Sequence, residues 1–285
     1  MRLHFRALAA MSIAVAIFCV AAGASAAKRD DSAAEKLGFK LSLQCWTFNR
    51  LTFFETVDKA AGLGIKYLEA FPGQKLKPDS KVGFGPGMSD EVCAEIKKKL
   101  ADAGGLQVVA FGVCGVPTDE KGARNMYEWA KKMGIEVLVT ETMPNDIHEK
   151  LCKEYNIKFA LHNHPQSWPP EKVLDACKGR CSLMGSCSDT GHWMRAKRCP
   201  IETLKLVEGR VEHLHFKDLN EFGGGHDVPW GTGKGDVKGM MQELKRQGFK
   251  GYFSIEYEHG SLDDLAKNLP ECVAFFDKTA AELAK

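Results

Sequence analysis

Histidines and carboxylates whose spacing suits metal binding and proton transfer recur along this chain. Two histidines flank an asparagine in ALHNHP, and an aspartate precedes a histidine by three residues in SDTGHW. Imidazole and carboxylate ligands without thiolates suit Mn, Co, Zn, Fe or Mg, and the same groups act as general acids and bases. The sequence therefore predicts one divalent metal ion and proton-transfer chemistry. The candidate residues are Glu69, Glu141, His162, His164, Asp189, His192, His213, His215, Lys217, Asp218, Glu256 and Glu258.

Nearly all of these candidates lie at the end of an apolar, strand-like run. The runs cover 40–48, 65–71, 106–113, 135–141, 157–164, 181–189, 211–218 and 251–258. Amphipathic helical segments alternate with them, over 53–64, 89–105, 120–134, 146–156, 169–179, 200–209, 236–248 and 261–285. A glycine commonly follows a helical segment before the next strand, which is a helix stop signal. Eight strand–helix units predict parallel strands and a single-domain (β/α)8 TIM barrel over residues 38–285.

In such a barrel the carboxyl ends of all strands meet at one face. Six of the eight predicted strands carry imidazoles or carboxylates there, and burying unpaired charges is costly. Packing does not account for this distribution, so we expect a functional site. Because residues two apart share a strand face, His213, His215 and Lys217 point the same way, as do Glu256 and Glu258. We prefer His215 and Glu256 as ligands because they are nearer the expected depth of the site.

The N-terminus has the pattern of a cleaved secretory signal peptide over residues 1–26. Arg2 and Arg6 precede an apolar run, and Ala24-Ser25-Ala26 is a small-residue cleavage site. An uncleaved membrane anchor is the alternative, but the polar residues that follow favour cleavage and a short linker over 27–37. No later apolar run is long enough to span a bilayer. We expect an exported protein, periplasmic or secreted.

The charge balance argues against nucleic-acid binding. Loss of residues 1–26 removes Arg2 and Arg6, so that 37 of the 39 basic residues remain against 37 acidic ones. A nucleic-acid-binding protein should carry a basic face. No GxGxxG turn follows the first strand, which argues against a dinucleotide site. The GTGKGD stretch has neither the glycine spacing nor the Ser or Thr of a phosphate loop.

Nine cysteines remain after the predicted cleavage, an odd number that leaves at least one thiol unpaired. An exported protein can form disulfides, and the cluster from Cys177 to Cys199 is the expected place for one. There is no CxxC pair, which argues against a structural zinc site.

The motifs YLEAFPG, ALHNHP, SDTGHW, HLHFKD, PWGTGKGD and SIEYE resemble the sugar phosphate isomerase/epimerase superfamily of xylose-isomerase-like barrels. The likeness covers nearly the whole chain beyond the signal peptide. It implies a metal ion held by the residue at position 162 together with Asp189, His215 and Glu256. It also implies that His192 contacts the substrate and that the loop 229–236 closes over the site.

One position departs from the family pattern. Family epimerases and isomerases carry a glutamate where this chain has His162, and that glutamate is one of two proton-transferring groups. A neutral imidazole can bind a metal and can act as a base, so we expect His162 to remain a ligand. The symmetric two-glutamate mechanism is in doubt, and Glu141 is a candidate for the missing carboxylate. We expect His164 to face away from the site as a hydrogen-bonding residue.

The leading hypothesis is a metal-dependent sugar isomerase or epimerase that acts through an enediolate. Glu256 or Glu141 would be the base, and His192 and Lys217 would stabilise oxyanion charge. The pocket-wall candidates are Trp46, Phe71, Trp193 and Trp230. The alternatives are a lyase or dehydratase acting on a keto-sugar and a non-catalytic carbohydrate-binding barrel. Phosphodiester cleavage, as in endonuclease IV, is disfavoured because the chain offers too few ligands. The partner is a small sugar, and the oligomeric state is left open.

Overall fold

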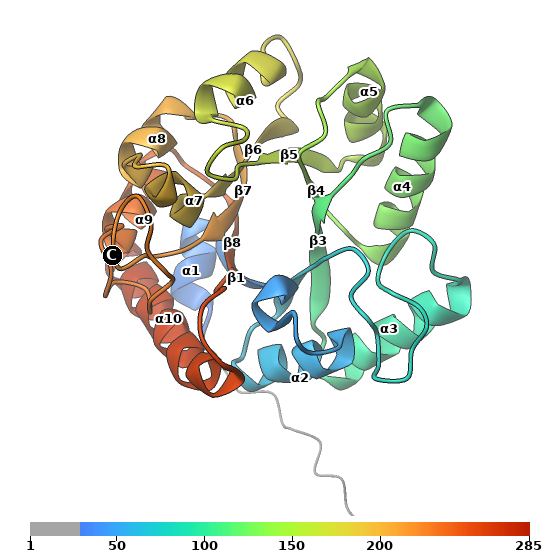
Figure 1. Ribbon diagram of the computed structural model, residues 1–285, viewed down its shortest axis with the longest axis horizontal. Coiled ribbons are helices and arrows are strands. Elements are labelled where there is room, and N and C mark those ends of the chain that lie inside the picture. Colours follow the sequence, from blue (N-terminus) through green and yellow to red (C-terminus); the bar gives the residue numbers. More distant parts are fainter. Residues whose placement is uncertain (1–28) are drawn as a thin grey trace, which may run out of the picture.

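Eight short apolar runs form the strands of a closed, parallel barrel in which each strand pairs with the next and β8 pairs with β1. The structure is a computed structural model and describes residues 29–285. In Figure 1 the strands form the central ring and the helices surround it. Parallel strands covered on both faces are usually long apolar runs, and the fully buried VLVT of β4 is an example. The strands are β1 (Phe39–Gln44), β2 (Tyr67–Ala70), β3 (Gln107–Cys114), β4 (Val137–Thr140), β5 (Lys158–His162), β6 (Met184–Asp189), β7 (Val211–Phe216) and β8 (Gly251–Ile255). The predicted (β/α)8 TIM barrel is confirmed.

All eight predicted helices are present and form the outer layer. Six of them start at a side-chain cap: Thr52 and Glu55 form a capping box on the first, and Ser89 caps the second. The other two, which begin at Pro170 and Pro200, start with a proline instead. The apolar sides of the eight helices pack on the outer faces of the strands. These helices are α2 (Phe53–Gly62), α3 (Asp90–Asp102), α4 (Glu120–Met133), α5 (Asp146–Tyr155), α6 (Pro170–Cys177), α8 (Pro200–Leu206), α9 (Val237–Arg246) and α10 (Leu262–Leu283).

Three further elements differ from the sequence-based expectation. The predicted first strand ends early, because the side chain of Gln44 accepts the backbone N–H of Trp46 and starts a 3-10 turn, η1 (Cys45–Phe48). SDTGHW contains a helix, α7 (Thr190–Arg195), rather than a loop. Part of the segment expected as a linker is helical, α1 (Ser32–Leu37).

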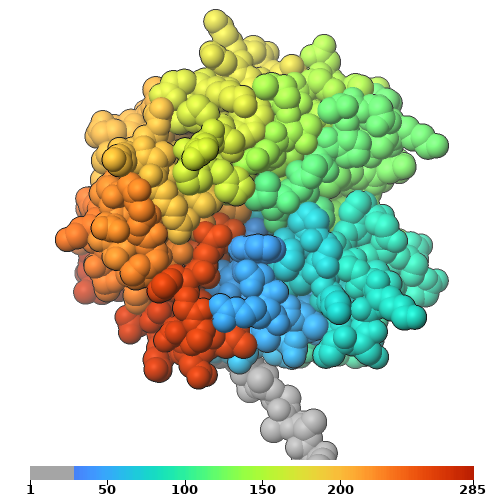
Figure 2. All heavy atoms as spheres, in the orientation of Figure 1, coloured from blue at the N-terminus to red at the C-terminus, as the bar shows by residue number. Residues whose placement is uncertain are grey.

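Arg29 and α1 tie the start of the described chain to its end. The Arg29 side chain donates to Asp277 of α10 over 2.9 Å and to the carbonyl of Gly64 over 3.3 Å. Asp31 pairs with Arg29 over 2.5 Å and with Lys66 over 2.7 Å. In Figure 2 the blue N-terminal and red C-terminal parts lie side by side, in agreement with the β1–β8 pairing.

The barrel interior is layered by polarity. A small apolar cluster fills part of it, and its members are Ala110, Val137, Val139, Ala160 and Cys187. Charged and polar side chains follow towards the carboxyl ends of the strands, where Asp189, His215 and Glu256 are buried. The fold therefore concentrates the polar candidates at one end.

The disulfide expected somewhere in the cluster from Cys177 to Cys199 is not formed, because all nine cysteines of residues 29–285 are free. Cys177 packs in the outer core and Cys187 inside the barrel, so β6 separates these two thiols. Within the same residues, no helix combines the length and the apolarity needed to cross a membrane. The predicted signal peptide, residues 1–26, lies outside the described part of the chain and stays a prediction.

Candidate active site

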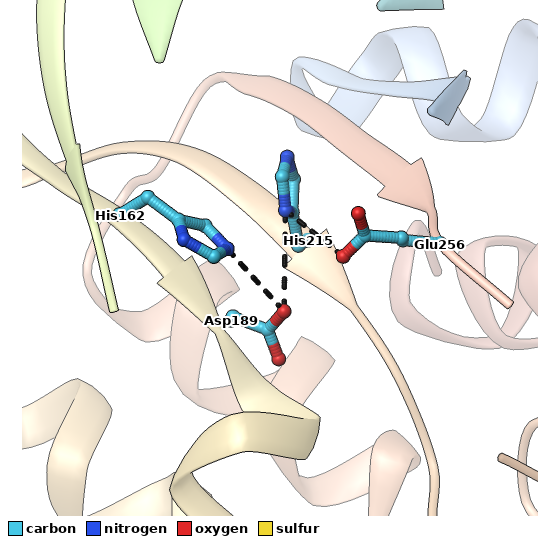
Figure 3. A group of neighbouring side chains, drawn as sticks. All are labelled: His162, Asp189, His215 and Glu256. Carbon is cyan, nitrogen blue, oxygen red and sulfur yellow. Dashed lines mark ion pairs between the residues drawn. The ribbon is translucent and has the colours of Figure 1, made fainter. Parts of the chain in front are cut away.

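Four buried side chains from four consecutive strands converge at the carboxyl end of the barrel: His162, Asp189, His215 and Glu256 (Figure 3). Each offers one ligand atom, and these atoms all lie within 4.8 Å of one another. Asp189 Oδ2 is 3.5 Å from His162 Nε2 and 3.9 Å from His215 Nδ1. His215 Nδ1 is 3.0 Å from Glu256 Oε2. The structure thus brings together the four residues that the resemblance implies as ligands.

Strand register explains the convergence of Asp189 and His215, which are direct partners between β6 and β7. Asp189 is also the N-cap of α7, and its Oδ1 accepts the backbone N–H of His192 over 2.7 Å. This bond orients the carboxylate so that Oδ2 faces the cluster. The α7 start therefore fixes one candidate ligand.

Both ring nitrogens of His162 are buried without a hydrogen-bond partner. His215 Nδ1 and Asp189 Oδ2 also form no hydrogen bond, although charged neighbours are close: Glu256 Oε2 lies 3.0 Å from the first and Lys217 Nζ 2.9 Å from the second. Unsatisfied buried polar atoms are rare and costly in folded proteins. Two imidazoles and two carboxylates in this arrangement match the donors that first-row divalent ions accept. The residues present thus fit a metal ion.

Lys217 lies beside this cluster and is fully buried. Its Nζ is 2.9 Å from Asp189 Oδ2 and 2.7 Å from oxygens of Glu256 and Glu258. Burial alone would lower the pKa of Lys217, but these three carboxylates raise it well above its ordinary value. Lys217 is therefore a fixed positive charge at the edge of the site.

His192 lies on the other side of Asp189, with Nε2 3.6 Å from Asp189 Oδ2. Arg195 donates to His192 Nδ1 over 3.0 Å, so Nδ1 is the acceptor and Nε2 carries the proton. Burial lowers the pKa of His192 to about 3, and the Lys217 charge acts in the same direction. His192 is thus a neutral imidazole with an N–H donor near the cluster.

Glu141 lies outside the group of four. Its Oε1 is 3.8 Å from His162 Nδ1, on the side of that ring away from Asp189. It also accepts hydrogen bonds from His164 and, over 3.0 Å, from Ser167. The structure therefore separates Glu141 from Glu256, the other candidate base.

The expectation that His164 faces away was wrong. Its ring centroid is 4.6 Å from that of His162 and 4.8 Å from that of His192, and it lines the same cavity. The expectation rested on strand alternation, but β5 ends at His162 and does not include His164. Even on a longer strand, residues two positions apart would point to the same face. The contact with Glu141 holds His164 at the pocket.

The cavity above the cluster has a volume of about 350 Å³. One wall consists of Trp46, Phe71 and Pro72, and the polar side includes His162, His192 and Glu256. Trp46 is 43% exposed and meets Phe71 edge-on, with centroids 5.0 Å apart. The cavity thus has an apolar wall and a polar wall.

Two of the four expected wall residues are not in the cavity. Trp193 and Trp230 are buried in the core between strands and helices, and the Trp230 ring packs edge-on against Phe216. The sequence shows that Trp193 belongs to SDTGHW and Trp230 to the 229–236 loop. It does not show whether their rings point into the cavity or into the core.

Sequence reasoning named Glu69 and His213 as strand-end residues and gave them no role. Both are fully buried inside the barrel, on the side of His215 that faces away from the other three candidate ligands. Glu69 accepts from His213 Nε2 over 2.6 Å and from His215 Nε2 over 2.9 Å. Burial alone would raise the pKa of Glu69, but the two imidazoles outweigh it and lower the pKa to about 2. The sequence feature that could have revealed this contact is the pair His213 and His215, two positions apart and therefore on one face of β7.

The chain belongs to the xylose isomerase-like TIM barrel family, whose family model matches residues 57–279. A solved structure of an uncharacterised protein from Parabacteroides distasonis is 34% identical, with a TM-score of 0.69. It matches 85% of this chain and 99% of its own. None of the curated proteins compared matches the chain.

Two neighbours with stated activities share the fold at low identity. A D-psicose 3-epimerase is 12% identical, with a TM-score of 0.65 over 85% of this chain and 99% of its own. A probable 3-DHS dehydratase from Bacillus anthracis is 14% identical, with a TM-score of 0.61. The match covers 83% of this chain and 98% of the dehydratase. The barrel is therefore common to proteins with different reactions.

Proposed function

We propose that this protein is a divalent-metal-dependent sugar isomerase or epimerase that acts through an enediolate. The observation that carries the proposal is the convergence of four buried ligand atoms beside an open cavity, with both ring nitrogens of His162 lacking a hydrogen-bond partner. Membership of the xylose isomerase-like family supports it. The proposed ligands are His162, Asp189, His215 and Glu256, with Mn, Co, Zn, Fe or Mg as the ion.

When bound, the ion would supply electrophilic stabilisation of the negative charge that develops on the substrate oxygens. The side chains supply the remaining functions. Glu256 lines the cavity and is the proposed base for the proton next to the substrate carbonyl. The Nε2–H of His192, which lines the cavity, would stabilise oxyanion charge. Lys217 is buried behind the cavity lining, and its positive charge would act through Asp189 and Glu256, which it contacts. The apolar wall at Trp46 and Phe71 suits the C–H face of a sugar.

Glu141 is a weaker candidate base than the sequence suggested. Its carboxylate faces His162 rather than the four-residue cluster, and unlike Glu256 it does not line the cavity. This leaves Glu256 as the main carboxylate base. A site with one main base favours a second candidate function, a lyase or dehydratase step on a keto-sugar, in which one proton leaves and a neighbouring substituent departs. The replacement of the family glutamate by His162 is the observation behind it.

The first test is elemental analysis of the purified protein beside His215→Ala, followed by a screen of sugars and keto-sugars. We expect about one equivalent of a divalent metal in the wild-type protein and a loss of metal and turnover in the variant. Proton exchange with solvent and epimer formation would support the isomerase or epimerase, and loss of a β-substituent would support the lyase.

A wild-type protein that binds no metal even after reconstitution would contradict the proposed mechanism. Sugar binding that persists in such a metal-free protein would instead support the third possibility, a carbohydrate-binding barrel without catalysis. Ligand binding measured before and after metal depletion separates these outcomes.

A further inference from the structure

Imidazole binds a metal through a nitrogen lone pair, so a histidine ligand must present its unprotonated nitrogen to the ion. His215 is fully buried, and its Nδ1 faces Glu256 and Asp189 at 3.0 Å and 3.9 Å. Its other nitrogen, Nε2, points the opposite way, to Glu69 at 2.9 Å. The two ring nitrogens thus have different partners.

A carboxylate accepts hydrogen bonds and does not donate them. The nitrogen of His215 that faces Glu69 must therefore carry a proton. Nδ1 faces the Glu256 carboxylate and would lose its own proton when a cation takes its lone pair, while the proton beside Glu69 stays. We propose that Glu69 is a positioning residue that holds His215 in the Nε2–H tautomer and aims its Nδ1 at a divalent cation. This inference rests on the proposed metal site.

Glu69 is itself held by further hydrogen bonds inside the barrel. Its second oxygen accepts from His213 Nε2 over 2.6 Å and from Ser254 Oγ over 3.2 Å. Ser254 Oγ also pairs with Ser42 Oγ over 2.6 Å. All of these groups are fully buried. The network joins β1, β2, β7 and β8, so the orientation of Glu69 is fixed by the strands themselves.

An outer carboxylate that takes the N–H of a metal-bound imidazole orients the ring and raises its basicity, and its loss typically costs about tenfold to hundredfold in metal affinity. His162 shows a looser version of the arrangement, because Glu141 lies 3.8 Å from its Nδ1 while Nε2 faces Asp189. The 2.9 Å contact from Glu69 to His215 is the closer of the two.

The test compares Glu69→Gln with the matched control Glu212→Gln. Glu212 is also a buried strand glutamate, but its carboxylate pairs with Lys158 over 3.0 Å and not with a candidate metal ligand. Affinity for Mn²⁺ is measured by titration calorimetry on metal-free protein, and unfolding is followed for both variants. We expect a loss of about tenfold to hundredfold for Glu69→Gln and no change for Glu212→Gln.

The tautomer is measured separately, by nitrogen-15 NMR of the histidine rings in zinc-loaded wild-type protein. We expect a protonated Nε2 on His215, whereas a protonated Nδ1 would overturn the proposal. Should Glu69→Gln not fold, His213→Phe keeps a ring and removes one bond to Glu69. It is expected to weaken Mn²⁺ binding by a smaller factor.

Unchanged Mn²⁺ affinity in a folded Glu69→Gln protein would overturn the inference and leave the proposed function standing. A wild-type protein that binds no Mn²⁺ or Zn²⁺ would remove the proposed function as well. The two failures are therefore distinguishable.

Discussion

Each buried charge at the site contacts several charged partners, and Lys217 is the main example. Its ammonium contacts the same oxygens of Asp189 and Glu256 that face the candidate metal position. It neutralises part of the carboxylate charge, which would otherwise be very costly to bury. Glu258 accepts from Lys217 and from Arg195, and so links the site to the pocket rim.

Asp227 is a second buried carboxylate near this rim. Its Oδ2 accepts from Arg195 over 3.3 Å and from the backbone N–H of Glu258 over 3.1 Å, while Oδ1 has no partner. Burial raises its pKa to about 6, although Lys217 and Arg195 act in the opposite direction. Folding therefore favours the protonated form of Asp227, which predominates in the folded protein below about pH 6.

This pKa gives a prediction for stability against pH. Because the folded-state pKa exceeds the ordinary value of 3.8, the stabilisation is complete below about pH 3.8 and is lost as the pH rises through about 6. Asp227→Asn cannot titrate. We expect the stability of wild type relative to this variant to fall by at most about 3 kcal/mol between pH 4 and 7.

Urea unfolding at several pH values measures this difference. The control is Asp175→Asn, at an exposed position on α6. A difference between wild type and Asp227→Asn that does not change with pH would show that Asp227 is not protonated in the folded protein.

At the scale of elements, the β7–α9 loop is built around one carboxylate. Asp218 Oδ2 accepts the backbone N–H groups of Gly231 and Gly233, and Oδ1 accepts that of Gly235, each over 2.9 Å. A Cβ on Gly233 would lie 2.4 Å from Asp218 Oδ1. The glycines thus let the backbone wrap closely around Asp218, which explains PWGTGKGD without a phosphate.

Asp218→Asn should loosen this loop. The amide replaces one accepting oxygen by a donor, so at least one backbone N–H loses its partner, at a cost of about 1–3 kcal/mol. We expect a lower free energy of unfolding and faster tryptic cleavage after Lys234, which is exposed in the loop. Glu221→Gln, an exposed change in the same loop, serves as control, and equal cleavage rates in both variants would contradict the prediction.

At the scale of the whole molecule, β1 pairs with β8 to close the barrel, and the two ends of the described chain are also in contact. The Arg29 side chain is only 8% exposed and joins Asp31, Gly64 and α10. A buried guanidinium with several partners contributes more than a surface pair. Residues 29–37 are therefore part of the folded barrel.

Arg29→Met should lower the free energy of unfolding by about 2 kcal/mol, because it leaves Asp277 without its partner and Asp31 with Lys66 alone. The comparison is Arg198→Met, which breaks the exposed Arg198–Glu171 pair and should cost less than about 1 kcal/mol. Urea denaturation of both variants gives the two values. A smaller loss for Arg29→Met than for Arg198→Met would show that the contact does not support closure.

Local pattern alone determined much of this protein. Apolar runs, helix caps and glycine stops depend on neighbours in the sequence, so the eight strand–helix units and the clustering of Asp189, His215 and Glu256 at one end were predictable. Only the tertiary structure decided the pairing of Glu69 with His213 and His215, the side on which Glu141 and His164 lie, and the burial of Trp193 and Trp230. These contacts join residues from different strands and loops, and their geometry depends on barrel register and loop path, which no local pattern encodes.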